Sequence, residues 1–95
     1  MAAYVVGNVE ITDPAGYEAY KKGVPATIAA YGGRYLTRGG AIEVLEGEWA
    51  PKRFVILEFP DMARAKAWHD SPEYRPLREI RARTAKSSLF VVEGL

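Results

Sequence analysis

The order of strand-like and helix-like segments restricts how this chain can fold more than any other feature. Within 95 residues, the hydrophobic pattern predicts strand, helix, strand, strand, helix and strand. A chain of this length is typical of one domain, here residues 1–95. Strands with helices packed against them make an α+β architecture. The expected strands are residues 4–11, residues 34–46 in two halves, residues 52–59 and residues 88–93.

This order is the split β-α-β layout of the ferredoxin-like class. Right-handed crossovers give the βαββαβ chain an antiparallel sheet of order 4-1-3-2, with two helices on one face. The other face is then bare, although the first strand carries apolar residues at positions of both parities. A domain this small buries only about 60–65% of its unfolded surface. We therefore expect a homodimer in which a second copy covers the bare face.

Composition excludes several classes of function. The chain has no cysteine, which excludes disulfides and thiolate sites. A net charge of +1 gives no overall attraction to nucleic acid or membranes. The longest uncharged run, residues 23–33, has 11 residues, and a membrane span needs roughly 20. The first nine residues lack a targeting signal, so we expect a cytoplasmic protein.

A long amphipathic helix is predicted after the first strand. Asp13 is placed to cap it, with Pro14 at the first helical position. Pro25 interrupts the pattern by removing an N–H, so we expect a kink there without an end to the helix. Gly32 and the glycine after it supply the stop. Its apolar face consists of Tyr17, Tyr20, Val24, Ile28 and Tyr31.

The next two strands form a predicted hairpin whose register stays open. The first strand of the hairpin consists of two halves, residues 34–38 and 41–46, and a bulge or turn is expected between them at Gly39-Gly40. If Ile42 lies opposite Ile56, then Gly40 lies opposite Glu58, with Arg38 as its diagonal neighbour.

Glu58 is the acid we expect to be most constrained. Alternation places it beside Phe54 and Ile56 on one face of its strand. Glu46 ends the half-strand 41–46 in a similar way. A carboxylate on an apolar sheet face is costly unless it is paired or functional. An ion pair, with Arg38 as the expected partner of Glu58, and a role in proton transfer both remain open.

The second helical region is expected in two parts. Asp61 caps a helix over 62–70, and Ser71 caps a restart with Pro72 first, which runs to about residue 85. Between residues 62 and 86, seven positive charges meet three negative ones. We interpret this as a solvated face, because no nucleic-acid motif or interleaved exposed aromatic residue accompanies it.

His69 and two large aromatic residues have two interpretations each. His69 is the only histidine, so it cannot build a metal site with other imidazoles. It is either a general base or a partly exposed helix residue. Trp68 and Tyr17 either pack in the core or form the wall of a pocket for a flat ligand.

Several short motifs together resemble a known family. They are Val24-Pro25-Ala26-Thr27-Ile28, Tyr31-Gly32-Gly33-Arg34-Tyr35-Leu36, Arg38-Gly39-Gly40, Leu45-Glu46-Gly47 with Trp49, Glu58-Phe59, Ala67-Trp68 and Ser71-Pro72-Glu73-Tyr74. The combination resembles a small bacterial domain-of-unknown-function family of the dimeric α/β-barrel superfamily, and it covers nearly the whole chain. The resemblance implies ferredoxin-like monomers that pair through their sheets, with pockets between sheet and helices.

The superfamily includes cofactor-free monooxygenases, isomerase-like enzymes and haem-degrading enzymes. The family pattern emphasises positions that are occupied here by Tyr17, Arg38, Glu46, Glu58, Trp68 and Tyr74. His69 stands where the pattern commonly has tyrosine, so the resemblance assigns it no role.

Two classes of function follow as expectations. The first is a homodimer whose sheet-to-helix pocket takes a small carbonyl or aromatic compound; one version of it is an enzyme that needs no cofactor or metal. Glu58 or His69 would then move a proton, and Arg38 would hold an anionic or enolate oxygen. Tyr17, Glu46, Trp68 and Tyr74 would contact the ligand. The alternative is a non-catalytic binding or stress-associated dimer. Neither version needs nucleic acid or a membrane.

Overall fold

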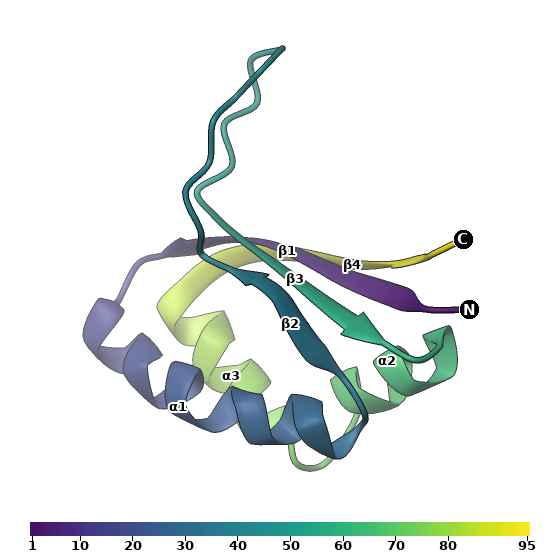
Figure 1. Ribbon diagram of the computed structural model, residues 1–95. Helices are drawn as coiled ribbons and strands as arrows, with labels where there is room; N and C mark the ends of the chain where they lie inside the picture. Colours follow the sequence, from purple (N-terminus) through teal and green to yellow (C-terminus); the bar gives the residue numbers. More distant parts are fainter.

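One antiparallel sheet carries all the helices on a single face (Figure 1). The computed structural model describes residues 1–95. The strand order β2-β3-β1-β4 is the predicted 4-1-3-2 order counted from the other edge, which confirms the ferredoxin-like prediction. None of the helices is both long and apolar enough to cross a membrane. The elements are β1 (Ala3–Ile11), α1 (Pro14–Ala30), β2 (Arg34–Arg38), β3 (Arg53–Phe59), α2 (Met62–His69), α3 (Arg75–Thr84) and β4 (Ala85–Glu93).

Helix α1 begins and ends at the residues that the sequence predicts. The Asp13 carboxylate accepts a hydrogen bond from the Gly16 N–H at 3.2 Å, with Pro14 in the first turn. The helix continues through Pro25 without an end. Gly32 has a φ of 77°, and the N–H of Gly33 bonds to the Ile28 carbonyl at 2.9 Å. This is a left-handed C-terminal cap, which glycine adopts without steric cost.

The hairpin differs from the prediction in length and register. Residues 41–46 form no strand, and β2 ends at Arg38. Their partner segment would be residues 47–52. That segment contains Gly47 with a φ of 84° and Pro51, which has no N–H, so a ladder cannot continue there. Residues 39–52, called the arm below, instead project from the sheet on the side away from the helices (Figure 1).

The predicted pairing of Glu58 is therefore wrong. Arg34 lies opposite Glu58, and Arg38 lies opposite Val55. The irregularity in the ladder falls between Tyr35 and Thr37 instead of at the double glycine. A one-residue slip moves a side chain to the other face of the sheet. Arg38 consequently faces the helices, while Glu58 faces the open side.

The second helical region is divided as expected, but its second part begins later. Ser71 to Tyr74 form a turn, in which the Ser71 hydroxyl accepts a hydrogen bond from the Tyr74 N–H at 3.1 Å. Helix α3 starts at Arg75, so Pro76 lies in its first turn. A helix starting at Pro72 would need an N–H from Pro76, which proline lacks. Asp61 caps α2 as predicted, through the Arg64 N–H at 2.8 Å.

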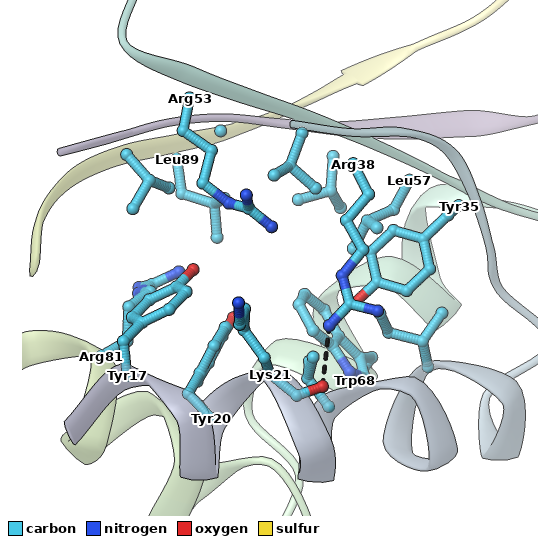
Figure 2. Close-up of a pocket in the computed structure, with 16 residues that line it drawn as sticks. Tyr17, Tyr20, Lys21, Tyr35, Arg38, Arg53, Leu57, Trp68, Arg81 and Leu89 are labelled. Carbon is cyan, nitrogen blue, oxygen red and sulfur yellow. Dashed lines mark hydrogen bonds between the residues drawn. The ribbon is translucent and has the colours of Figure 1, made fainter. Parts of the chain in front are cut away.

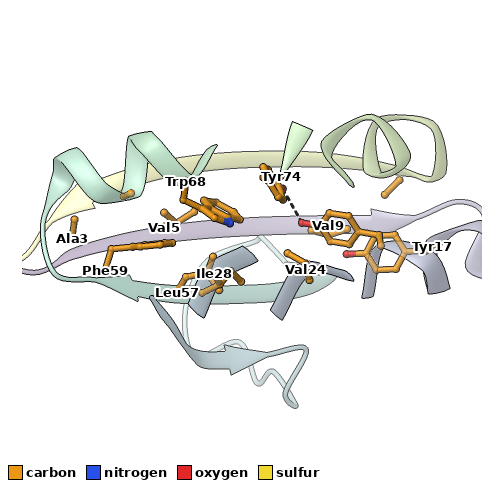
Figure 3. Close-up of a cluster of buried hydrophobic side chains, with 13 residues drawn as sticks. Ala3, Val5, Val9, Tyr17, Val24, Ile28, Leu57, Phe59, Trp68 and Tyr74 are labelled. Carbon is orange, nitrogen blue, oxygen red and sulfur yellow. Dashed lines mark hydrogen bonds between the residues drawn. The ribbon is translucent and has the colours of Figure 1, made fainter. Parts of the chain in front are cut away.

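The core fills the space between the sheet and the helices (Figure 3). Trp68 from α2 stacks 5.5 Å from Phe59 of β3, and both are at most 1% exposed. The opposite face of the same sheet has no cover. There, Phe90 and Val92 of β4 are 59% and 46% exposed.

Candidate functional site

A cavity lies between the helix-facing side of the sheet and α1, with residues of β1, β2 and β3 above it (Figure 2). The cavity itself is small, with a volume of about 30 Å³. Together with its open mouth, the space that is free of protein atoms amounts to about 480 Å³. A ligand larger than one or two waters must therefore displace side chains. The movable ones are the long side chains of Lys21, Arg38 and Arg53, which line the cavity.

Stacked aromatic rings form one wall of this cavity. Tyr17 and Tyr20 on α1 have ring centres 5.1 Å apart, and both line the cavity with Trp68. Behind them, Tyr74 stacks on Trp68 at 4.1 Å, and the Tyr20 and Tyr74 hydroxyls share a hydrogen bond of 2.8 Å. Burial raises the pKa of Tyr20 and of Tyr74 above the usual value. Both hydroxyls therefore stay protonated and can only donate or accept hydrogen bonds.

Arg38 is positioned by the proline in α1. Its Nη2 donates to the Lys21 carbonyl at 2.7 Å. In a regular helix that carbonyl would accept the N–H of residue 25, which in this chain is proline. The guanidinium carbon also lies 4.8 Å from the Tyr35 ring centre, a cation–π distance. Arg38 thus replaces the hydrogen bond that Pro25 removes and remains at the cavity.

Arg53 and Arg81 also line the cavity, and neither was among the candidate residues. Arg53 reaches from β3 into the space near Tyr17 and Arg38 (Figure 2). Gly39, with a φ of 71°, leaves room for it, since a Cβ there would meet the Arg53 Nη1 at 2.5 Å. The signal was present in the sequence, because alternation places Arg53 on the same face as Val55 and Leu57.

Glu58 lies outside this cavity, on the open face of the sheet. Its carboxylate accepts from the Arg34 Nε at 2.7 Å, and its side chain is 25% exposed. Of the two alternatives for Glu58, the structure shows an ion pair, and its partner is Arg34 instead of the predicted Arg38. Glu46 lies in the exposed arm, so the structure does not bring these two acids together with Tyr17, Arg38 and Trp68.

His69 ends α2 on the outer side of Trp68. It lines a separate hollow between α2 and β4, in which about 520 Å³ is free of protein atoms, its open mouth included. The Arg78 Nη1 lies 3.3 Å from its Nδ1. Partial burial, followed by the positive charges of Arg78 and Arg81, lowers the pKa of His69 below its usual value. No group of three His, Asp or Glu side chains in the chain could hold a metal ion.

The sequence places the protein in a family. Residues 2–95 match the family described as a domain of unknown function, DUF1330. This chain is a member of the DUF1330 family. No curated protein has a sequence similar enough to count as a relative.

Solved structures share the fold of this DUF1330 chain at low identity. A protein of unknown function from Rhodopseudomonas palustris has a TM-score of 0.77 and 20% identity, over 99% of this chain and 82% of that one. SnoaB, a cofactor-independent oxygenase from Streptomyces nogalater, has a TM-score of 0.67 and 14% identity, over 99% and 93%. A dimeric ferredoxin-like protein of unknown function from Jannaschia sp. CCS1 has a TM-score of 0.67 and 12% identity, over 99% of this chain and 100% of that one.

Proposed function

We propose that this DUF1330 protein is a homodimer that binds a small carbonyl or aromatic compound in its sheet-to-helix cavity. The observation that carries the proposal is the cavity itself, which has an aromatic wall of Tyr17, Tyr20 and Trp68 and a polar lip at Arg38. Apolar walls with a few placed polar groups are typical of small-molecule sites. The cation at the lip is suited to hold a carbonyl or enolate oxygen.

The homodimer is supported by the open face of the sheet. Phe54, Ile56, Phe90 and Val92 lie there without any helix over them. A contiguous exposed apolar patch usually marks an interface. The Jannaschia neighbour, with the same fold, is described as dimeric. A face-to-face pair of sheets would bury roughly 2,000 Å² if the dimer is permanent.

The binding site can be tested by filling the cavity. Val55 lines it from β3 and is half-buried, so Val55→Phe should occupy the free space. Small carbonyl and aromatic compounds would be screened by thermal shift, which reports ligands that bind the folded state. The same change at Val44, in the exposed arm, is the matched control. We expect some compounds to stabilise both the wild type and Val44→Phe but not Val55→Phe. Compounds that still stabilise Val55→Phe would show that they do not bind in the cavity.

A cofactor-free enzyme is the second candidate. It is favoured by the likeness in fold to SnoaB, a cofactor-independent oxygenase, and by the cation at the cavity. The simplest reaction is enolisation, in which a proton leaves the carbon beside a carbonyl and the electron pair moves onto the oxygen held by Arg38. The cavity contains no carboxylate or imidazole. Glu58 lies on the opposite face of the sheet, so of the two predicted bases only His69, on the outer side of Trp68, remains a candidate for the proton acceptor.

Exchange of the ligand's α-hydrogen in D₂O, followed by NMR, tests this enzymatic form. Compounds from the screen would be incubated with the wild type, Glu58→Gln and His69→Gln. Loss of exchange in His69→Gln, with binding retained and with exchange unchanged in the control Glu58→Gln, would identify the proton acceptor. The absence of exchange in the wild type would leave a binding protein, which is the non-catalytic alternative.

A further inference from the structure

The charges around the cavity are all of one sign. Among its lining residues are Lys21, Arg38, Arg53 and Arg81, and no aspartate or glutamate. Lys21 is already paired with Glu18 at 3.0 Å. None of the three arginines lies within 4.0 Å of a carboxylate. The other ion pairs of the chain are formed by Arg34, His69 and Arg78. The cavity thus has uncompensated positive charge.

Two of these arginines also have nitrogen donors without acceptors. The Nε atoms of Arg53 and Arg81 are both buried and have no hydrogen-bond partner. Arg81 uses its Nη1 to donate to the Tyr74 hydroxyl at 3.2 Å. A buried donor without an acceptor destabilises the folded protein, more so on a charged group, so native proteins rarely retain one without a purpose. Both donors belong to side chains that line the same cavity.

We propose that the ligand of this cavity is a small organic carboxylate, which is held by Arg53 and Arg81. This inference rests on the proposed function and names the ligand class of the same site. The planar guanidinium fork matches a carboxylate through paired N–H···O bonds. The apolar body of the ligand would lie against Tyr17 and Trp68, which form the wall. A neutral carbonyl compound would leave the charge of the arginines without a counter-charge, and a cationic ligand would be repelled.

Benzoate and benzamide are a suitable pair of probes, because they have nearly the same shape and differ in charge. Dissociation constants would be measured by NMR titration at constant ionic strength for the wild type, Arg53→Gln, Arg53→Lys, Arg81→Gln and Arg83→Gln. Arg83 is exposed on α3 and does not line the cavity, so it controls for the loss of one positive charge.

We expect benzoate to bind the wild type at least about tenfold more tightly than benzamide, as a charge-assisted hydrogen bond provides. Arg53→Gln should weaken benzoate by about tenfold and leave benzamide unchanged. Arg53→Lys should recover part of the loss, and Arg83→Gln should have no effect. Higher salt should weaken benzoate alone.

Three results would overturn the inference, and they differ in what they say about the site. If both probes bind equally well and both lose binding in Val55→Phe, the cavity is a ligand site that has no preference for anions. A benzoate preference that survives in both Arg53→Gln and Arg81→Gln would place the anion elsewhere. Binding of neither probe would remove the anion site together with the proposed function.

Discussion

The two faces of the sheet are built from similar residues and differ in what covers them. On the helix-facing side, Val5 and Leu57 are each 4% exposed. On the open side, Phe90 and Val92 are about half exposed, and the arm that rises beyond this side carries Leu45 at 91%. Alternation along a strand assigns residues to faces, but it does not say whether the cover comes from the same chain. The apolar residues that the helices do not cover are the ones that a second copy would cover in the proposed homodimer.

The largest expected effect is on the helix-facing side. Trp68→Ala would empty a site that is 1% exposed and remove the hydrogen bond from its indole N–H to the Thr27 hydroxyl at 3.1 Å. Loss of a buried tryptophan costs about 3–5 kcal/mol in the free energy of unfolding. Urea denaturation at a fixed protein concentration would measure it.

The matched variant is Trp49→Ala in the arm. Trp49 is 64% exposed, and its ring meets that of Phe54 edge to face, with ring centres 6.0 Å apart. We expect a loss of less than about 1 kcal/mol. A loss at Trp49 as large as that at Trp68 would show that the arm is as well covered as the core, which would break the comparison.

The second prediction separates folding from assembly on the open side. Ile56 faces away from the helices and is half-buried in one protomer. Ile56→Asp would place a charge at the centre of the expected sheet-to-sheet contact. We expect dimer affinity to fall by about 100-fold or more, as for a central interface residue. Light scattering should then show monomers, while circular dichroism shows retained helices.

Ile42→Asp in the arm is the companion variant. Ile42 is 39% exposed, so the same change there leaves the sheet face intact. Dimers that persist in Ile42→Asp would confine the contact to the sheet, whereas monomers would extend it to the arm. A wild-type protein that is monomeric at tens of micromolar would contradict the dimer altogether.

The sequence predicted the parts of the fold that depend on local chemistry. Asp13 and Asp61 cap helices because a short carboxylate can accept a backbone N–H two or three residues later. The strand order followed from the handedness of the connections. The position of Glu58 on the same face of its strand as Phe54 and Ile56 followed from alternation. Each of these depends only on nearby residues or on general rules of connection.

The parts that depend on distant pairing could not be predicted. The partner of Glu58 changed from Arg38 to Arg34 because β3 pairs with residues 34–38 and not with residues 41–46. A one-residue slip of the ladder between Tyr35 and Thr37 then places Arg38 opposite Val55, on the helix-facing side. Nothing in the local sequence fixes the position of such a slip. The hydrogen bond of Arg38 likewise depends on the Lys21 carbonyl, which lies on a different element.

The third prediction tests that long-range contact. Arg38→Met removes the donor to the Lys21 carbonyl and should cost about 0.5–1.5 kcal/mol, because the bond is exposed and water can replace the donor. Pro25→Ala supplies a backbone N–H to the same carbonyl. In the Pro25→Ala background, the cost of Arg38→Met should therefore fall by about 1 kcal/mol, as a double-mutant cycle measures. If the two changes are additive, the arginine does not replace the missing helical bond.

The smallest effect concerns His69, at the outer edge of the covered side. Partial burial and the charges of Arg78 and Arg81 lower its pKa in the folded protein, and Asp70 opposes them only in part. The unfolded chain regains a pKa of about 6.5, so between the two values it binds more protons than the folded chain. The free energy of unfolding then rises with pH. The contribution is fully present above about pH 6.5 and is lost as the pH falls through the folded pKa.

His69→Gln should remove this dependence. Between pH 7.5 and 5, the wild type should lose slightly more stability than the variant, in urea titrations at equal protein concentration. The physical reason is local: the neutral Nδ1 can accept from Arg78, 3.3 Å away, whereas a protonated ring would place two cations in contact. Parallel losses in the two proteins would mean that solvent screens His69 from the arginines. The edge of the helix layer would then behave like the open face instead of like the core.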